Sequence, residues 1–116
     1  MISENQNREM NPIRVGVLGF GGLGQAAARV LAPKTEMKWV AAADKKGCAY
    51  NSEGLNPDTC INTYHHQGSV GFVEPWGILC DDGIGELIKT APVEGYFLAL
   101  PNLPNTFMAS VAQQFI

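Results

Sequence analysis

The stretch Ile13–Leu31 reads IRVGVLGFGGLGQAAARVL, and five glycines between Gly16 and Gly24 interrupt its otherwise apolar sequence. An ordinary tight turn needs only one or two glycines. Three of the five stand at the fixed spacing Gly19-x-Gly21-x-x-Gly24. Because glycine has no side chain, this spacing predicts that another group comes very close to the backbone here.

The segments around these glycines predict a βαβ unit. Residues 13–19 are rich in Val, Ile and Leu and end in glycines, which is typical of a buried strand in a parallel sheet. Residues 22–33 predict a helix that ends at Pro33. The apolar side chains at helical spacing are Leu23, Ala26, Ala27, Val30 and Leu31. A second apolar run, Met37–Ala43, stops at Asp44 and predicts the next strand.

In a strand–turn–helix unit each of the spaced glycines has a mechanical task. Gly19 permits the tight turn, Gly21 lets a pyrophosphate lie against the backbone, and Gly24 lets the helix pack closely on the strand. The helix N-terminus directs free N–H groups at the phosphates. Asp44 follows Gly24 by 20 residues, where a carboxylate can accept hydrogen bonds from a ribose 2′-OH. We therefore predict an α/β, Rossmann-type doubly wound, mainly parallel sheet with helices on both faces.

The acidic residue at the end of the second strand also bears on the choice of cofactor. A carboxylate at Asp44 repels a 2′-phosphate, which favours NAD over NADP. Lys45 and Lys46 follow immediately and can offset that repulsion, or they can be two solvated turn residues. We expect NAD as the cofactor, with NADP as the alternative.

The bulk properties describe a small globular protein. The chain has 116 residues, 46% hydrophobic and 16% charged, and its net charge of −3 argues against a nucleic-acid partner. No apolar run reaches the roughly 18 residues of a membrane helix. Residues 1–12 are predicted to be a flexible tail, too polar for a secretory signal. The three cysteines are widely spaced, which favours reduced thiols in a cytoplasmic protein.

The rest of the chain gives weaker signals. Residues 45–75 are rich in loop-forming residue types, with a short helix predicted at 57–65 and a short strand at 69–73. A helix is predicted at 82–90, with the Asp81-Asp82 pair serving as its cap, and a buried strand at 96–100. A last helix, capped by Asn105 or Thr106, still continues at Ile116. We expect residues 13–116 to be a cofactor domain that is truncated before a substrate domain.

A resemblance to known families rests on the segment ADKKGCAYNSEGLN, Ala43–Asn56. Its Asp, Lys-x-Gly, Tyr-Asn and Gly-Leu-Asn pieces resemble the NAD(P)-binding domain of homoserine dehydrogenases. The same segment is similar to the cofactor domain of glutamate dehydrogenases, and Gly68, Ser69 and Val70 match a Gly-Ser-Val-like continuation in both families. The early GFGGLG resembles homoserine dehydrogenase, where the cofactor domain comes first.

The resemblance implies an NAD(P)-dependent dehydrogenase that transfers hydride between the nicotinamide cofactor and a small amino-acid-type substrate. It implies that the glycines hold the pyrophosphate, that Asp44 and Lys45 lie near the adenine ribose, and that residues 99–101 face the nicotinamide half. The implied cofactor-binding residues are Gly19, Phe20, Gly21, Gly22, Leu23, Gly24, Asp44, Lys45, Ala99, Leu100 and Pro101. No catalytic residue is carried over, because those of homoserine dehydrogenases lie beyond the cofactor domain.

Two other functions stay open at this point. Homoserine dehydrogenases usually read Thr-Pro where this chain has Leu100-Pro101-Asn102, and the Pro-Asn pair is similar to sugar dehydrogenases of the glucose-fructose oxidoreductase type. A nucleotide-sensing regulatory module without catalysis uses the same fold, and fold does not separate the two classes. We expect no metal site at His65-His66, which lack further ligands at suitable spacing, and we expect a homo-oligomer that covers the open sheet edge.

Overall fold

The βαβ unit predicted around the glycine turn is present in the computed structural model, which describes residues 12–99 and 106–108. Strand β1 (Ile13–Leu18) leads through the turn into helix α2 (Gly22–Leu31), and β2 (Met37–Asp44) returns parallel to β1. The other elements are β3 (Gly47–Tyr50), α3 (Pro57–Gln67), the 3-10 helix η1 (Val70–Phe72), β4 (Gly77–Leu79), α4 (Gly83–Thr90), β5 (Gly95–Leu98) and β6 (Thr106–Met108).

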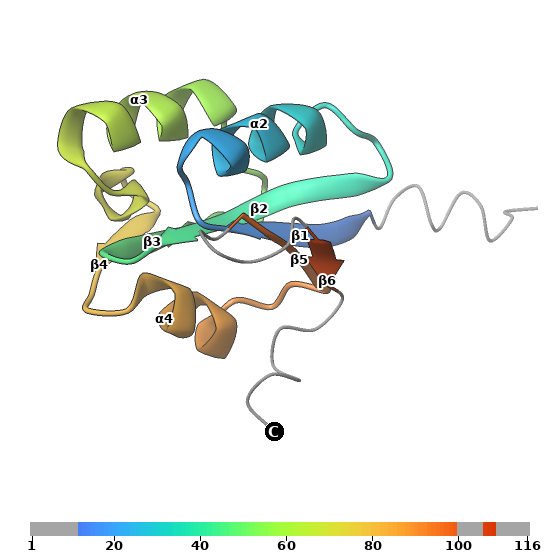
Figure 1. Ribbon diagram of the computed structural model, residues 1–116. Helices are drawn as coiled ribbons and strands as arrows, with labels where there is room; N and C mark the ends of the chain where they lie inside the picture. Colours follow the sequence, from blue (N-terminus) through green and yellow to red (C-terminus); the bar gives the residue numbers. More distant parts are fainter. Residues whose placement is uncertain (1–11, 100–105, 109–116) are drawn as a thin grey trace, which may run out of the picture.

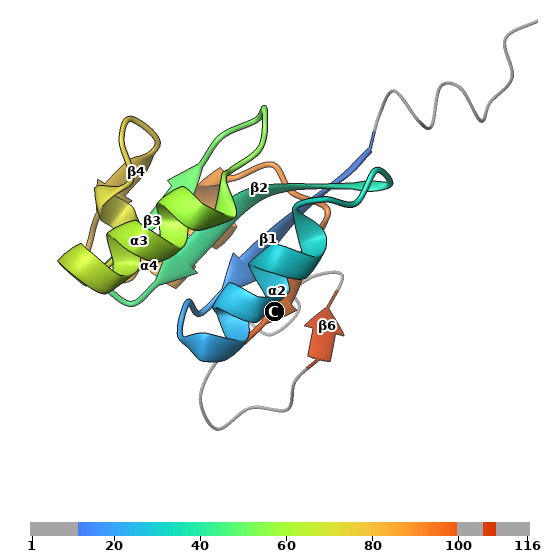
Figure 2. The same cartoon turned by 90° about the horizontal axis from the view of Figure 1, so that it is seen from above.

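The described strands form one sheet in the order β4-β3-β2-β1-β5-β6. The three central strands β2, β1 and β5 are parallel, whereas β3, β4 and β6 are each antiparallel to the neighbour they join. Helices α2 and α3 lie side by side on one face, and α4 covers the other (Figure 1 and Figure 2). The predicted α/β Rossmann-type fold with helices on both faces is therefore confirmed.

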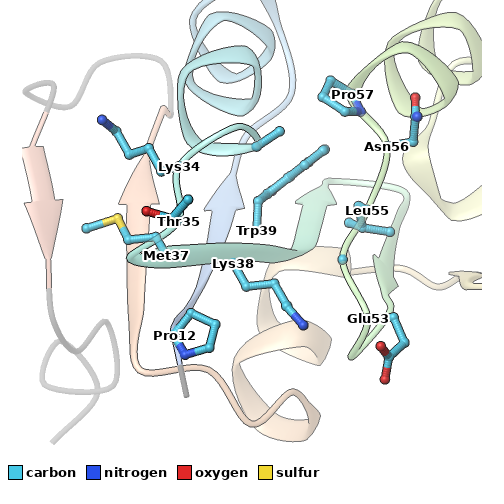
Figure 3. Close-up of a pocket in the computed structure, with 12 residues that line it drawn as sticks. Pro12, Lys34, Thr35, Met37, Lys38, Trp39, Glu53, Leu55, Asn56 and Pro57 are labelled. Carbon is cyan, nitrogen blue, oxygen red and sulfur yellow. The ribbon is translucent and has the colours of Figure 1, made fainter. Parts of the chain in front are cut away.

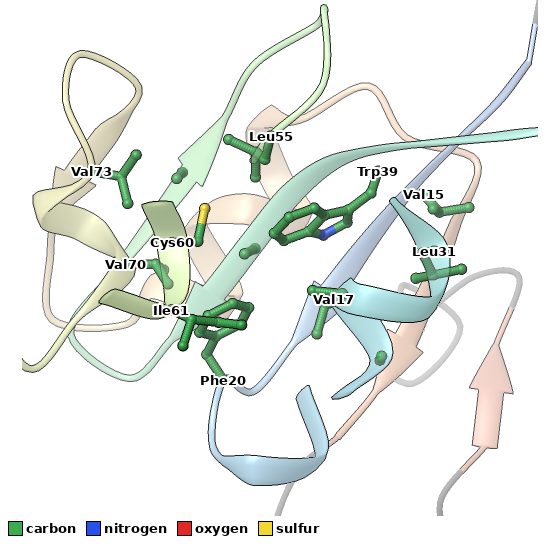
Figure 4. Packing of buried hydrophobic residues seen from close by; sticks show 14 residues of the cluster. Val15, Val17, Phe20, Leu31, Trp39, Leu55, Cys60, Ile61, Val70 and Val73 are labelled. Atoms are coloured by element: carbon green, nitrogen blue, oxygen red, sulfur yellow. The ribbon is translucent and has the colours of Figure 1, made fainter. Parts of the chain in front are cut away.

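Two apolar clusters hold these layers together. Under α2 and α3, the Phe20 and Trp39 rings stack with centroids 6.2 Å apart, and Ile61 and Val17 pack around them (Figure 4). On the other face, buried side chains of the sheet pack under Leu87 of α4. Burying a side chain of this size stabilises the fold by about 1.5–3 kcal/mol. The sheet is therefore fixed from both sides, and its strand ends are held in place.

Two predicted helices begin directly after a residue whose side chain caps them. Helix α3 begins after Asn56, whose side chain accepts a hydrogen bond from the Thr59 N–H at 3.0 Å. Helix α4 begins after Asp82, whose carboxylate accepts one from the Gly85 N–H at 3.0 Å. Both caps satisfy a backbone donor that has no partner within its helix. The helices at 57–65 and 82–90 are thus confirmed, the first running on to Gln67.

Two predictions of secondary structure are wrong. The strand predicted at 69–73 is the 3-10 helix Val70–Phe72, because Ser69 caps it by accepting from the Gly71 N–H at 2.9 Å. The helix predicted after Asn105 or Thr106 is a strand at Thr106–Met108, where it completes the edge beside β5. Residues 109–116 of that predicted helix lie outside the described residues, as do residues 1–11 of the predicted tail.

Helix α2 buries only some of its apolar side chains. Of the apolar residues at helical spacing, Leu23 and Val30 are 41% and 59% exposed. The helix instead packs through Ala27, Ala28 and Leu31. The close contact made at Gly24 sets this rotation, because it brings the glycine side of the helix against the strand. Within the described part of the chain, no helix has the length and apolar character to span a membrane.

Candidate functional site

A cleft of about 400 Å³ opens at the carboxyl ends of the three parallel strands. Gly19 follows β1, Asp44 ends β2, and Ala99 follows β5. The chain leaves β1 for β2 on one side and reaches β5 on the other, so the cleft lies at the switch point where open α/β sheets bind ligands. The residues that line it are Gly19, Phe20, Gly21, Asp44, Lys45, Lys46, Tyr64, Gly68, Ile84 and Ala99.

The glycine turn has the geometry that a close backbone approach requires. Gly19 has a φ of 95°, a conformation that side chains disfavour, and its N–H donates to the Ala43 carbonyl at 2.8 Å. A Cβ at Gly24 would overlap the Gly19 carbonyl oxygen, so a side chain there would push the helix off the strand. A Cβ at Gly21 would meet nothing within 4 Å. Gly21 lines the cleft and the space beside it is open, as a close approach of a ligand to the backbone requires.

The start of α2 is suited to an anion. Its N-cap Gly21 makes no side-chain cap, and no acidic residue stands in the first turn. The N–H groups of a helix N-terminus and its dipole attract negative charge. The turn is also braced from outside, because Gln25 Nε2 donates to the Phe20 carbonyl at 3.0 Å and Gln25 Oε1 lies 3.2 Å from His65 Nε2. The helix end that is suited to an anion is thus held in place by contacts from outside the turn.

Asp44 is buried and accepts hydrogen bonds from four donors of the chain, which its place in the motif does not predict. The residue is 7% exposed. Its Oδ1 accepts hydrogen bonds from the backbone N–H of Lys46 and Gly47 and from Ser69 Oγ at 2.8, 3.0 and 2.8 Å. Its Oδ2 accepts one from the Val70 N–H at 2.7 Å. The carboxylate therefore holds the turn into β3 and the start of η1, while it also borders the cleft.

Lys45 and Lys46 form the two-residue turn between β2 and β3, since Asp44 pairs with Gly47 across it. Both lysines are exposed, and both line the cleft. The ion pair found among the described residues joins Arg29 to Asp58 at 3.0 Å, so no carboxylate in that part of the chain lies within 4.0 Å of either ammonium group. The turn places two positive charges at the rim of the cleft.

The remaining predicted site residues fall into three groups. Phe20 lines the cleft, although its ring is buried against Trp39. Gly22, Leu23 and Gly24 form the first turn of α2 beside the cleft and are not among its lining residues. Ala99 lines the cleft, and its N–H donates to the Leu18 carbonyl at 2.8 Å. Leu100 and Pro101 lie outside the described residues.

Sequence reasoning missed three lining residues, Tyr64, Gly68 and Ile84. Tyr64 and Gly68 belong to the end of α3 and its C-cap, and Ile84 belongs to the start of α4. No sequence motif marks Tyr64 and Ile84, because they reach the cleft only through the packing of α3 and α4 on opposite faces of the sheet. The Gly-Ser-Val segment was noted only as a family feature, yet Gly68 borders the cleft and Ser69 holds Asp44.

A second hollow, of about 440 Å³, lies at the opposite end of the sheet (Figure 3). Pro12 precedes β1 there, and Thr35 and Met37 surround the start of β2, with Lys34 and Glu53 at its rim. The amino ends of parallel strands carry no glycine turn and no helix N-terminus of the βαβ unit. We therefore assign the candidate site to the cleft at the carboxyl ends.

The cysteines and histidines give no reactive group at the cleft. Burial raises the pKa of the Cys48 thiol to about 12, with a further contribution from nearby Cys80, so the thiol stays protonated near neutral pH. His66 Nδ1 lies 2.8 Å from the carbonyl of Asn62 in its own helix. His65 and His66 thus make separate local contacts.

Comparison with known proteins agrees with this geometry. A solved structure assigned as a homoserine dehydrogenase from Archaeoglobus fulgidus matches with a TM-score of 0.52 at 22% identity, covering 72% of this chain and 26% of that one. This likeness concerns the fold. The (S)-8-amino-7-oxononanoate synthase BioU of Haloferax mediterranei is 26% identical over 133 aligned residues, which cover 91% of this chain and 38% of the relative.

The glutamate dehydrogenase of Thermotoga maritima is 38% identical over 56 residues, which cover 48% of this chain and 14% of the enzyme. The chain thus spans well under half the length of these curated relatives. The family described as Glutamate/Leucine/Phenylalanine/Valine dehydrogenase matches residues 1–81, a span that contains the glycine turn, Asp44 and the Gly-Ser-Val segment. The chain is an NAD(P)-binding, Rossmann-like domain, and it belongs to the glutamate/leucine/phenylalanine/valine dehydrogenase family.

Proposed function

We propose that residues 13–116 are the cofactor-binding half of an NAD(P)-dependent oxidoreductase that acts on a small amino-acid-type substrate. One observation carries the proposal: Gly19, Gly21, Asp44 and Ala99 meet in one cleft at the carboxyl ends of β1, β2 and β5. The family match and the glutamate dehydrogenase relative support an amino-acid-type substrate.

The residues in the cleft fit the parts of a dinucleotide in order. The open space at Gly21 and the uncapped start of α2 receive the diphosphate. The Lys45–Lys46 turn lies by the adenosine half, and Ala99 lies by the nicotinamide half. When bound, the nicotinamide ring accepts or donates a hydride. The chain's own residues bind the cofactor, orient it across the strand ends and keep the turn rigid.

A binding titration tests the proposal. The chain is titrated by calorimetry with NADH and NADPH, and we expect saturable binding of at least one of them. A leucine at Gly21 should abolish binding, because its side chain would fill the space that the diphosphate needs. Ala26→Leu is the matched control, since Ala26 is exposed on the same helix and does not line the cleft. Unchanged binding in the Gly21 variant would refute the assignment of the cleft.

A further inference from the structure

We propose that this cleft selects NADP(H) over NAD(H), with Lys45 and Lys46 binding the 2′-phosphate and Asp44 serving as a structural anchor of the turn. The inference rests on the proposed function and adds the form of cofactor that the site takes. The sequence alone favours NAD, because a free carboxylate at the end of β2 accepts the ribose hydroxyls and repels a 2′-phosphate. The hydrogen bonds of Asp44 change that expectation.

The lone pairs of Asp44 are largely taken by donors of the chain itself. A carboxylate offers about four acceptor positions, two on each oxygen. Oδ1 accepts three donors, more than its two lone pairs, and Oδ2 accepts one; all four donors come from the chain itself. One acceptor position is left, on Oδ2, so the two oxygens of Asp44 cannot both accept from the ribose. The carboxylate of Asp44 thus stabilises the turn into β3 through its hydrogen bonds to Lys46 and Gly47.

The exposed charges that line this part of the cleft are positive, whereas the negative charge of Asp44 is buried. Asp44 is buried, and three backbone N–H groups and one hydroxyl direct the positive ends of their dipoles at it. These dipoles offset its negative charge as seen from the cleft. Lys45 and Lys46 are exposed on the lining of the same cleft. Two positive charges thus stand against one buried negative charge at the place where the two cofactors differ.

Neighbouring carboxylates do not pair with Lys45 or Lys46 within residues 12–99. Asp82 is close in the fold, because the Gly83 N–H faces the Lys45 carbonyl at 3.4 Å. Its Oδ1 is already used to cap α4 at the Gly85 N–H. Within residues 12–99, neither lysine has a carboxylate inside 4.0 Å. Both ammonium groups are therefore available to a phosphate.

The test compares cofactors that differ only in the 2′-phosphate. Calorimetry is run with NADPH and NADH, and with the fragments adenosine 2′,5′-bisphosphate and 5′-AMP, which lack the nicotinamide. We expect the phosphorylated member of each pair to bind about tenfold or more tightly, as charge-assisted contacts of this kind provide. The double variant Lys45→Gln/Lys46→Gln should remove this preference, because it weakens NADPH binding about tenfold more than it weakens NADH binding.

The matched control is Lys34→Gln/Lys89→Gln, which removes the same charge from two exposed lysines away from the cleft. The control should keep the preference, and added salt should reduce it in the wild type because the contacts lie near solvent. Tighter or equal binding of NADH by the wild-type chain would overturn this inference while the proposed function stands. Absence of binding by all four probes would instead overturn the proposed function. An equal loss in both double variants would show a long-range charge effect and also refute the roles of Lys45 and Lys46.

Discussion

Ser69 Oγ donates a hydrogen bond to Asp44 Oδ1 at 2.8 Å, and this contact joins the start of η1 to the end of β2 across 25 residues of sequence. Both residues are buried, with Ser69 fully enclosed. The same Ser69 oxygen accepts from the Gly71 N–H at 2.9 Å. The turn from Asp44 to Gly47 and the Gly-Ser-Val segment are thus two parts of one polar network beside the candidate cleft.

Asp44→Asn should therefore destabilise the whole domain. The asparagine amide keeps one oxygen, but an NH₂ group replaces the other. In one orientation the NH₂ group faces the Val70 N–H. In the other it faces the three donors that Oδ1 now accepts. A buried donor left without an acceptor costs about 1–3 kcal/mol, and a charged acceptor adds to this loss. We expect a decrease of about 2–4 kcal/mol in the free energy of unfolding, measured by urea denaturation at neutral pH.

Asp58→Asn is the control for this prediction. Asp58 also loses a charge, but its ion pair with Arg29 at 3.0 Å joins two side chains that are 57% and 75% exposed. Exposed pairs of this kind contribute only about 0–1 kcal/mol. Equal unfolding midpoints for the two variants would contradict the structural role of Asp44.

The predictable and unpredictable parts of this fold differ in how far apart the interacting residues lie. The glycine turn, α2 and the cap of α4 within the Asp81-Asp82 pair were predicted because each depends on residues within a few positions. Strands β3 and β4 were not, since a segment such as Gly47–Tyr50 gains its strand conformation by pairing with β2 and β4 on either side. The bounds of β3 and β4 therefore depend on pairing in the assembled sheet.

The candidate site divides in the same way. Gly19, Gly21 and Asp44 were found from spacing, and all three line the cleft. The four donors of Asp44 were not foreseen, because two of them lie 25 and 26 residues further along the chain. Spacing therefore located the carboxylate correctly but gave no information on which partners occupy it.

Gly24→Ala should destabilise the domain although alanine is the better helix former. The added Cβ would overlap the Gly19 carbonyl oxygen, a backbone atom that cannot rotate away. Overpacking of this kind costs about 1–3 kcal/mol, more than the about 1 kcal/mol that helix propensity returns. Gly22→Ala is the comparison, because its Cβ would meet nothing within 4 Å and should leave stability equal or slightly higher. Thermal unfolding followed by circular dichroism measures both, and a stable Gly24 variant would argue against the close strand–helix contact.

Stability should fall as the pH rises above about 9. Burial raises the pKa of the Cys60 thiol from 9.0 to about 12, and burial likewise raises the pKa of Tyr96 from 10.0 to about 12. Between these values the unfolded chain has released protons that the folded chain still holds, so unfolding becomes more favourable with each increase in pH. The stability that the fold gains by keeping these buried groups protonated is fully present below pH 9 and is lost as the pH rises toward 12.

Urea midpoints measured below pH 9 and again between pH 9 and 12 follow this effect. Cys60→Ala lowers stability at every pH, because Cys60 is fully buried, but its midpoint should decline less steeply since one titrating group is gone. A decline as steep as in the wild type would show that other groups govern alkaline unfolding.

The contact between Gln25 and His65 should support cofactor binding without touching the cofactor. Gln25 Nε2 donates to the Phe20 carbonyl, which leaves Gln25 Oε1 as an acceptor, so the group at His65 Nε2 must be an N–H. The pair ties the glycine turn to α3. We expect Gln25→Leu and His65→Ala each to weaken dinucleotide binding about three- to tenfold, and the double variant to be no worse than the stronger single one, because coupled residues are not additive.

His66→Ala is the control, since His66 contacts only its own helix through the Asn62 carbonyl among the described hydrogen bonds. Calorimetry with the tighter-binding cofactor measures all four variants, and additive losses in the double variant would mean that Gln25 and His65 act separately.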